Sequence, residues 1–131
     1  MKVLALDFGS ARTGVAVSDP TGSVARPVGV VEDAASEQGI ARVLALARDE
    51  GVELIVVGLP ITLRGERGAQ AKETERFVES LRAATDVPVD SFDERFTTKL
   101  AGAIPTSAPE DAAAAAHLLT SYLTWKSRRA T

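Results

Sequence analysis

Asp7 is the first residue whose type and position point to chemistry. It ends the apolar run from Val3 to Leu6 and stands directly before Phe8 and Gly9. An ionised carboxylate in a buried strand costs several kcal/mol of folding free energy unless a cation or hydrogen bonds compensate it. The alternative is a strand-end Asp that caps the turn at Gly9. Because the residues before it are all apolar, we expect a functional carboxylate.

A second group of charges follows a later apolar segment. Asp93, Glu94 and Arg95 come directly after residues 87–92, which are expected to form the fifth strand. Ligands of open α/β sheets bind outside the carboxyl ends of the strands. These side chains are therefore candidates for a site, and the alternative is an ordinary cluster of surface charges.

Asp111 is the third acid, in the first turns of the expected last helix. At three- and four-residue spacing it shares a stripe with core-type residues, namely Ala114, Ala115, Leu118 and Tyr122. Its carboxylate is therefore expected to point towards the sheet. The alternative is an acid that complements the helix N-terminal dipole, and the neighbouring Glu110 could do this equally well.

Three carboxylates that converge would form a metal site. Two of them about 4 Å apart repel by roughly 4 kcal/mol at an effective dielectric constant of about 20, so a third requires a proton or a cation. Oxygen ligands without cysteine or clustered histidine favour Mg²⁺ or Mn²⁺. Carboxylate-held ions of this kind support in-line displacement at phosphorus. The convergence is inferred from the expected order of elements, because spacing alone does not prove it.

Basic side chains near these acids in the sequence are candidate phosphate contacts. Arg12 lies in the first hairpin, Arg64 in the loop after the fourth strand, and Arg95 and Lys99 after the fifth. Arg binds phosphate as a fork and Lys as a point charge. Solvated loop charge is the alternative for each of them.

Other conspicuous residues are interpreted as packing residues. His117 lies well around the last helix from Asp111 and is expected to be packed or half-exposed, not to act as a base. The large aromatic residues are expected in the core, without an aromatic platform for nucleic-acid bases; they are Phe77, Phe92, Phe96 and Trp125.

The elements that must position these residues follow from the period of the apolar residues. Strands are expected at residues 2–9, 13–19, 24–32, 53–59 and 87–92, and helices at 36–51, 69–84, 97–104 and 110–125, with a frayed basic tail at 126–131. Pro27 favours a sheet edge for the third strand. Ser36 is a candidate N-cap and Gly51 a candidate C-terminal stop. The order predicts one α/β domain, residues 1–131, with a mixed five-stranded sheet and helices on both faces.

Composition excludes several classes of site. The chain has 131 residues, which corresponds to one domain, with no cysteine and a single histidine. Disulfides, zinc–thiolate sites and iron–sulfur clusters are therefore excluded. The formal net charge is −3, an excess of acids equal to the three proposed ligands. No apolar run is long enough to span a bilayer and no signal peptide is visible, so we expect a soluble cytoplasmic protein.

Four motifs, in this order, resemble the YqgF (RuvX) family of small bacterial proteins. They are LALDFGSARTGVAVSD, VVGLP, DERFTT and DAAAAAHLLTSYL, which together span nearly the whole chain. The resemblance implies an RNase H-like fold with strand order 3-2-1-4-5 and an acidic metal site like that of the resolvase RuvC. By this likeness Asp7, Glu94 and Asp111 are the catalytic acids that hold Mg²⁺ or Mn²⁺, and Asp93 is a weaker candidate.

The resemblance implies a nuclease whose partner is nucleic acid, with RNA favoured over branched DNA, and no membrane. The expected activity is phosphodiester hydrolysis that matures the 5′ end of pre-16S ribosomal RNA. One alternative is a Holliday junction resolvase that acts on branched DNA as a homodimer and not as a monomer. Another is a non-catalytic RNA-binding assembly factor, slightly favoured by the uncharged residues 103–109, where the family usually has a longer basic loop. Residues 61–65 also depart from the polar stretch that the family usually carries there. An actin-like ATPase is disfavoured, because such enzymes place nucleotide between two domains of this kind.

Overall fold

The computed structural model describes residues 1–60, 68–94 and 110–129. These residues form strands and helices in the predicted order. The elements are β1 (Val3–Asp7), β2 (Arg12–Ser18), β3 (Ala25–Glu32), α1 (Glu37–Glu50), β4 (Leu54–Leu59), α2 (Ala69–Ala84), β5 (Val89–Asp93) and α3 (Glu110–Arg129).

The strands form one mixed sheet in the order β3-β2-β1-β4-β5. β1 pairs with β2 and β2 with β3 in antiparallel fashion, because short turns join them. β1 and β4, and β4 and β5, are parallel. The predicted strand order is therefore confirmed, and Pro27 lies in the edge strand β3 as expected.

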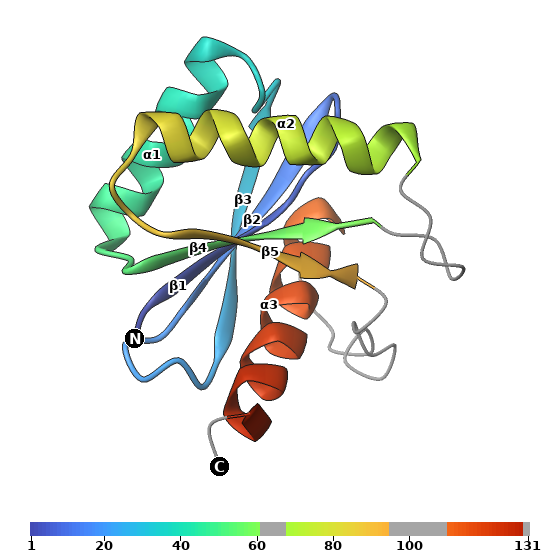
Figure 1. Ribbon diagram of the computed structural model, residues 1–131. Helices are drawn as coiled ribbons and strands as arrows, with labels where there is room; N and C mark the ends of the chain where they lie inside the picture. Colours follow the sequence, from blue (N-terminus) through green and yellow to red (C-terminus); the bar gives the residue numbers. More distant parts are fainter. Residues whose placement is uncertain (61–67, 95–109, 130–131) are drawn as a thin grey trace.

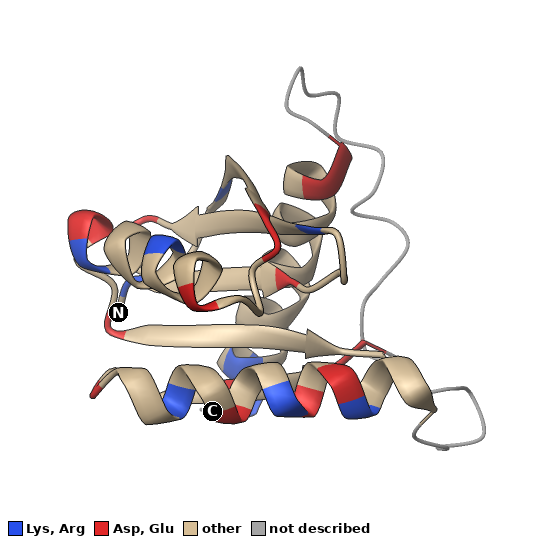
Figure 2. Cartoon of the chain, turned by 90° about the horizontal axis from the view of Figure 1, so that it is seen from above, with Lys and Arg blue, Asp and Glu red and all other residues tan. Residues whose placement is uncertain are grey.

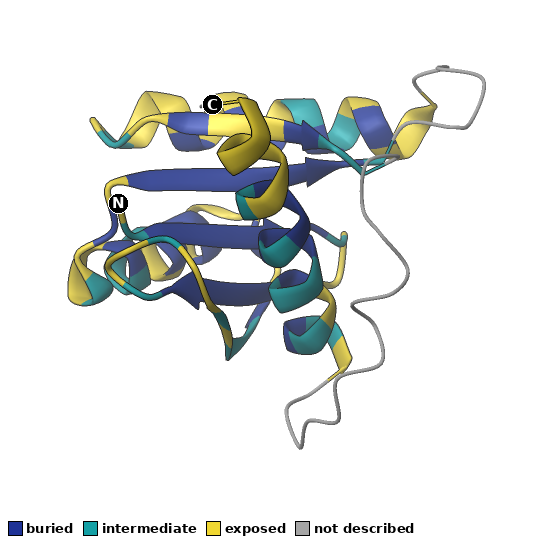
Figure 3. Cartoon of the chain, turned by 90° about the horizontal axis from the view of Figure 1, so that it is seen from below, coloured by how far each residue is buried: buried dark blue, intermediate teal, exposed yellow. Residues whose placement is uncertain are grey.

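Helices cover both faces of the sheet (Figure 1). α1 and α2 pack on one face, where Leu4, Val15 and Ile55 belong to the same apolar cluster as Phe77. α3 packs on the opposite face, against Ala5 and Val56. The side chains of β1 and β4 point alternately into these two clusters, so β4 is buried along its whole length and β1 is buried up to Asp7 (Figure 3).

The ends of α1 follow from two residues that the sequence marks. Ser36 Oγ accepts a hydrogen bond from the Gly39 N–H at 3.0 Å, which confirms the N-cap. Gly51 adopts a left-handed conformation with φ 66°, and its N–H donates to the carbonyls of Ala47 and Arg48. Both boundaries of the helix were therefore predictable from local chemistry.

The last helix differs from its predicted form. α3 continues to Arg129, so residues 126–129 are helical and not frayed; cations in a last turn complement the helix dipole. Ala114 is exposed while Ala112 is buried, so the stripe that faces the sheet lies slightly around the helix from the expected one. Trp125, expected in the core, is 36% exposed. The predicted helix at 97–104, Phe96 and the residues 107–109 before α3 lie outside the described residues.

None of the described helices is long and apolar enough to cross a membrane.

Candidate active site

Asp7 and Glu94 meet at one edge of the sheet because their strands run parallel. Asp7 ends β1 and Glu94 directly follows β5, with β4 between the two strands. Neighbouring strands lie about 4.8 Å apart, so Glu94 must reach across β4 to contact Asp7. It passes over Gly58, where an added Cβ atom would lie 2.6 Å from Glu94 Oε1. The missing side chain at Gly58 therefore makes room for this carboxyl group.

A hydrogen bond joins the carboxyl groups of Asp7 and Glu94, which are both half-buried. Burial is the main cause that raises the pKa of Glu94 to about 7, and the charge of Asp7 and the hydrogen bond add to it. Burial also raises the pKa of Asp7; the bond to Glu94 opposes this rise and the charge of Asp111 adds to it. A hydrogen bond between two carboxyl groups needs one proton, and these directions place that proton on Glu94.

Asp111 approaches this pair from the first turn of α3. Its charge acts on Asp7, and its Oδ2 atom lies 3.3 Å from Arg12 Nε. Gly14, opposite Asp7 in the register of β1 and β2, lets the helix come close. A Cβ atom on Gly14 would lie 1.8 Å from the Asp111 carbonyl oxygen. The first turn of α3 therefore rests on the backbone of β2, and this contact positions Asp111.

Hydrogen bonds within the turn between β1 and β2, and one bond to α2, stabilise this turn. The buried Thr13 hydroxyl donates to the Gly9 carbonyl and accepts from the Gly9 N–H, each at 3.4 Å. Ser10 Oγ donates to Glu73 Oε1 of α2 at 2.8 Å. Glu73 and Gly58 were not predicted as site residues. Gly58 carried a signal, because a glycine inside an apolar strand often marks a close approach; Glu73 carried none.

Some of the other residues singled out in the sequence lie in the described part of the structure, and the rest lie outside it. Asp93 ends β5, and its charge is a further cause of the raised pKa of Glu94. His117 is half-buried on α3, as expected. Three predicted phosphate contacts, Arg64, Arg95 and Lys99, lie outside the described residues, as do the segments 61–65 and 103–109.

The acids supply the oxygen donors that Mg²⁺ or Mn²⁺ prefers. Within residues 1–60, 68–94 and 110–129, no three Asp, Glu, His or Cys side chains are gathered closely enough to hold an ion. Asp7 and Glu94 nevertheless meet with one proton between them. A cation that replaced this proton would find two half-buried carboxylates in place. The donor chemistry of Asp7 and Glu94 therefore fits a hard divalent cation.

The Asp7–Glu94 contact predicts how stability depends on pH without metal. The folded protein binds the Glu94 proton more tightly than the unfolded chain, because the pKa rises from 4.5 to about 7 on folding. The contribution of Glu94 to the free energy of unfolding should therefore be full below pH 4.5 and be lost as the pH rises through about 7. After allowance for solvent screening of a half-exposed group, we expect a loss of about 1–2 kcal/mol.

Denaturant unfolding in EDTA at pH 5 and pH 7.5 measures this loss. Glu94→Gln should flatten the difference between the two pH values. The matched control is Glu32→Gln, at the exposed end of β3, which should keep the wild-type difference. An identical pH dependence in wild type and Glu94→Gln would show that the contact does not hold a proton.

Curated relatives carry the name "Putative pre-16S rRNA nuclease". One from Chloroflexus aurantiacus (strain ATCC 29366 / DSM 635 / J-10-fl) is 45% identical over 96 residues, 73% of this chain and 63% of the relative. One from Chloroflexus aggregans is 40% identical over 130 residues, 92% of each chain. One from Rubrobacter xylanophilus is 49% identical over 100 residues, 76% of this chain and 70% of the relative. The chain thus spans less than two thirds of the first relative and nearly all of the second.

The fold is similar to that of RuvC from Thermus thermophilus, solved in complex with a Holliday junction substrate. The TM-score is 0.68 and the identity 18%, over 98% of this chain and 96% of that chain. At this identity the similarity concerns the fold alone, and it confirms the predicted RNase H-like architecture. A family model described as "RuvX: Holliday junction resolvase" matches residues 1–125. Together with the relatives, this match shows that the chain belongs to the RuvX family, a family of nucleases, as its motifs predicted.

Proposed function

We propose that the protein is a metal-dependent nuclease that hydrolyses phosphodiester bonds in RNA during 5′ maturation of pre-16S ribosomal RNA in the cytoplasm. The observation that carries the proposal is the half-buried Asp7–Glu94 contact at the carboxyl edge of the sheet, which holds a proton where a cation would fit. Family membership supports the class of reaction. The names of the relatives support RNA as the substrate.

Each acid has a distinct task in this proposal. Asp7 and Glu94 would hold Mg²⁺ or Mn²⁺ after Glu94 loses its proton, and Asp111 would complete the charge of the site. When bound, the divalent cation would lower the pKa of a water molecule and offset the charge that develops on the phosphate. Arg12, whose side chain is 65% exposed beside Asp111, would turn from this acid to a phosphate oxygen.

A cleavage assay tests the proposal directly. A labelled RNA with the 5′-extended end of a 16S precursor should be cut with Mn²⁺ or Mg²⁺ and remain intact in EDTA. Cutting that persists in EDTA, or an RNA that stays intact with either metal, would refute a metal-dependent ribonuclease. If that RNA is bound but never cut, the non-catalytic assembly factor becomes the better description.

A junction resolvase is the second candidate, because the matching family description names that activity. Symmetric resolution of a four-way DNA junction needs two sites, and a C2 homodimer supplies them. Light scattering with and without a junction distinguishes the candidates. A chain that stays monomeric on the junction and cuts only RNA would leave ribosomal RNA processing as the function.

Gly58→Ala should separate catalysis from folding. The new Cβ atom would lie 2.6 Å from Glu94 Oε1 and 3.0 Å from Leu118 Cδ2. Both are ends of side chains and not backbone atoms, so the fold can accommodate the methyl group at a cost of about 1 kcal/mol, the lower end of the range for an added methyl group. Glu94 must move away from Asp7, however, and a displacement of about 1 Å can lower a rate about a hundredfold.

The Gly58→Ala comparison uses steady-state cleavage rates and melting temperatures. The control is Gly29→Ala in the edge strand β3, where an added Cβ atom meets nothing within 4 Å. A Gly58→Ala protein that cleaves at the wild-type rate would mean that catalysis does not require the position of Glu94 over β4.

A further inference from the structure

The C-terminal turns of α3 carry an exposed aromatic ring with cations around it. Trp125 is 36% exposed, whereas its ring neighbours Phe92 and Tyr122 are each 3% exposed. The Trp125 ring lies 5.6 Å from Phe92 and 5.9 Å from Tyr122, measured between centroids. The indole therefore packs against a buried aromatic cluster on one side and stays partly exposed to solvent. We call Trp125, Lys126, Arg128 and Arg129 the α3 end surface.

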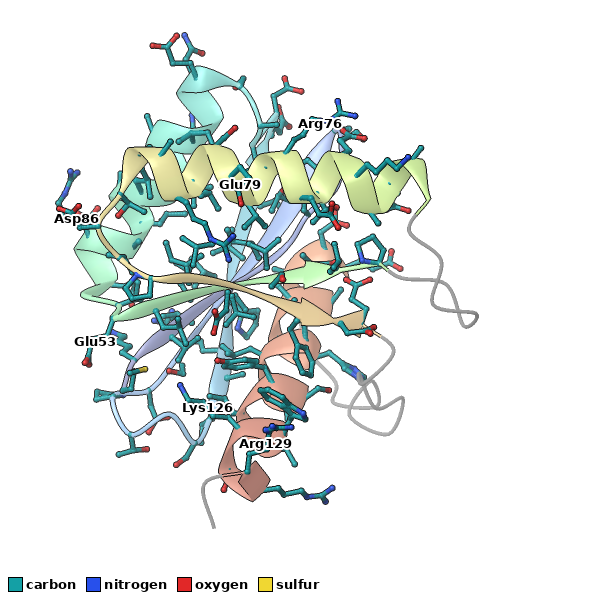
Figure 4. All side chains as sticks on the ribbon, in the orientation of Figure 1. Glu53, Arg76, Glu79, Asp86, Lys126 and Arg129 are labelled. Atoms are coloured by element: carbon teal, nitrogen blue, oxygen red, sulfur yellow. The ribbon has the colours of Figure 1, made fainter. Side chains whose placement is uncertain are left out.

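The cations of this surface are arranged around the rings. The Arg129 guanidinium lies 5.0 Å from the Trp125 centroid, and Lys126 Nζ lies 5.8 Å from the Tyr122 centroid. Figure 4 labels Lys126 and Arg129 close to one another at this end of the helix. α3 has its acids in the first turn and its cations in the last (Figure 2). In a chain of net charge −3, this is a local concentration of positive charge.

Stabilisation of the helix explains only part of this arrangement. Cations in a last turn complement the helix dipole wherever they point. The dipole gives no reason to leave the largest aromatic side chain of the chain partly in water. Asp90, on β5, forms a hydrogen bond with the Tyr122 hydroxyl. An exposed ring with a stacked guanidinium is the combination that binds single-stranded nucleic acid.

The position of the surface relates it to the acids. Trp125 follows Asp111 by 14 residues, which is close to four helical turns, and Arg129 follows it by five turns. Both therefore lie on the same stripe of α3 as Asp111, about 21 Å along the axis for Trp125. At a stacked spacing of about 3.4 Å this corresponds to about six nucleotides.

We propose that the α3 end surface binds a single-stranded flank of the RNA substrate, about six nucleotides from the scissile bond. A base stacks on Trp125, and Lys126, Arg128 and Arg129 contact the phosphates. This inference depends on the proposed ribonuclease function, because it assigns the place where that substrate continues beyond the acids. According to this inference, the affinity for RNA comes from the α3 end surface and not from the net charge of the chain.

Trp125 reports on its own surface, because it is the only tryptophan of the chain. A fluorescein-labelled single-stranded 12-nucleotide RNA is titrated against Asp7→Asn protein with Mg²⁺, and anisotropy gives the dissociation constant. The unlabelled RNA is titrated in parallel for indole emission. Binding should quench the emission, and Trp125→Ala should weaken binding about tenfold. Arg129→Ala should reduce the slope of log K against log salt by about 0.7.

Two further variants guard against effects on folding. Trp125→Phe keeps an aromatic face and should bind RNA nearly as well as the parent protein. Arg48→Ala removes an exposed cation from α1, on the opposite face of the sheet, and should leave the dissociation constant unchanged. Equal weakening by Trp125→Phe and Trp125→Ala would argue against stacking and overturn the inference.

The remaining outcomes distinguish a failure of the proposed RNA-binding surface from a failure of the proposed nuclease function. RNA that binds by anisotropy, with unchanged indole emission and an unaffected Trp125→Ala variant, overturns the inference and leaves the nuclease proposal intact. RNA that does not bind at all, or a four-way DNA junction that quenches Trp125 and displaces the RNA, also overturns it. Quenching by RNA together with a wild-type protein that cuts no RNA supports the surface and refutes the proposed function.

Discussion

Asp7→Asn is expected to lower the rate of RNA cleavage at least about a thousandfold. The amide keeps the shape of the side chain but supplies no charge for a divalent cation. Loss of about 4 kcal/mol of transition-state stabilisation, the scale of charge stabilisation by a metal ion, corresponds to this factor. Single-turnover cleavage of the 5′-extended RNA with saturating Mn²⁺ measures the rate without interference from product release.

The same substitution should leave the metal-free protein at least as stable at pH 7.5. Asp7 and Glu94 both resist ionisation where they stand, so removal of one charge relieves a cost of folding. The pKa of Glu94 should also move towards its ordinary value, because the charge of Asp7 contributes to raising it. A variant that is inactive yet not destabilised is the expected sign of a site that sacrifices stability for function.

Asp49→Asn is the matched control for the charge change. Asp49 is an exposed acid of α1, with a side chain 73% exposed and a 3.9 Å contact to Arg48. It should cleave at the wild-type rate and melt at the wild-type temperature. Cleavage by Asp7→Asn within a few-fold of wild type would contradict the assignment of Asp7, whatever the result for stability.

Much of the fold was predictable because its signals are local. Short turns after Asp7 and Asp19 require antiparallel neighbours, and the continuous apolar run of β4 requires a strand covered on both faces. Ser36 and Gly51 mark the ends of α1 by capping chemistry alone. The length of α3 was mispredicted, since its last turn is supported by ring contacts of Lys126 and Arg129 with side chains that packing brings together.

The acids were conspicuous in the sequence because they interrupt apolar patterns, but their geometry was not. Contact between Asp7 and Glu94 depends on the space above Gly58, on the strand that lies between β1 and β5 in the sheet. The exposure of Trp125 depends on how much of its ring is covered by Phe92, near the end of β5. The helical repeat predicts the direction in which a side chain points. Whether that side chain is buried depends on the strand or helix that packs against it, and the repeat carries no information about this neighbour.

The approach of α3 to β2 is the contact on which the third acid depends. Asp111 is placed by its own backbone, which lies directly over Gly14. The Asp111 carbonyl oxygen and carbon, at 1.8 and 2.4 Å from an added Cβ atom, are backbone atoms that no rotamer change can remove. The structure therefore predicts a different outcome here than at Gly58, where a side chain can turn away.

Gly14→Ala should destabilise the fold by about 3 kcal/mol, at the upper end of the range for overpacked sites, because the whole first turn of α3 must lift from the sheet. For a domain of this size the melting temperature should fall by about 10 °C. Below that temperature the variant should still fold but cleave RNA poorly, since Asp111 and its partner Arg12 move with the helix. Gly29→Ala is the same substitution on the neighbouring strand β3, where Gly29 pairs with Val15 and the new methyl group has open space around it; it should be neutral. Equal melting temperatures for the two variants would mean that α3 does not rest on β2 at Gly14, and that Asp111 is positioned by other contacts.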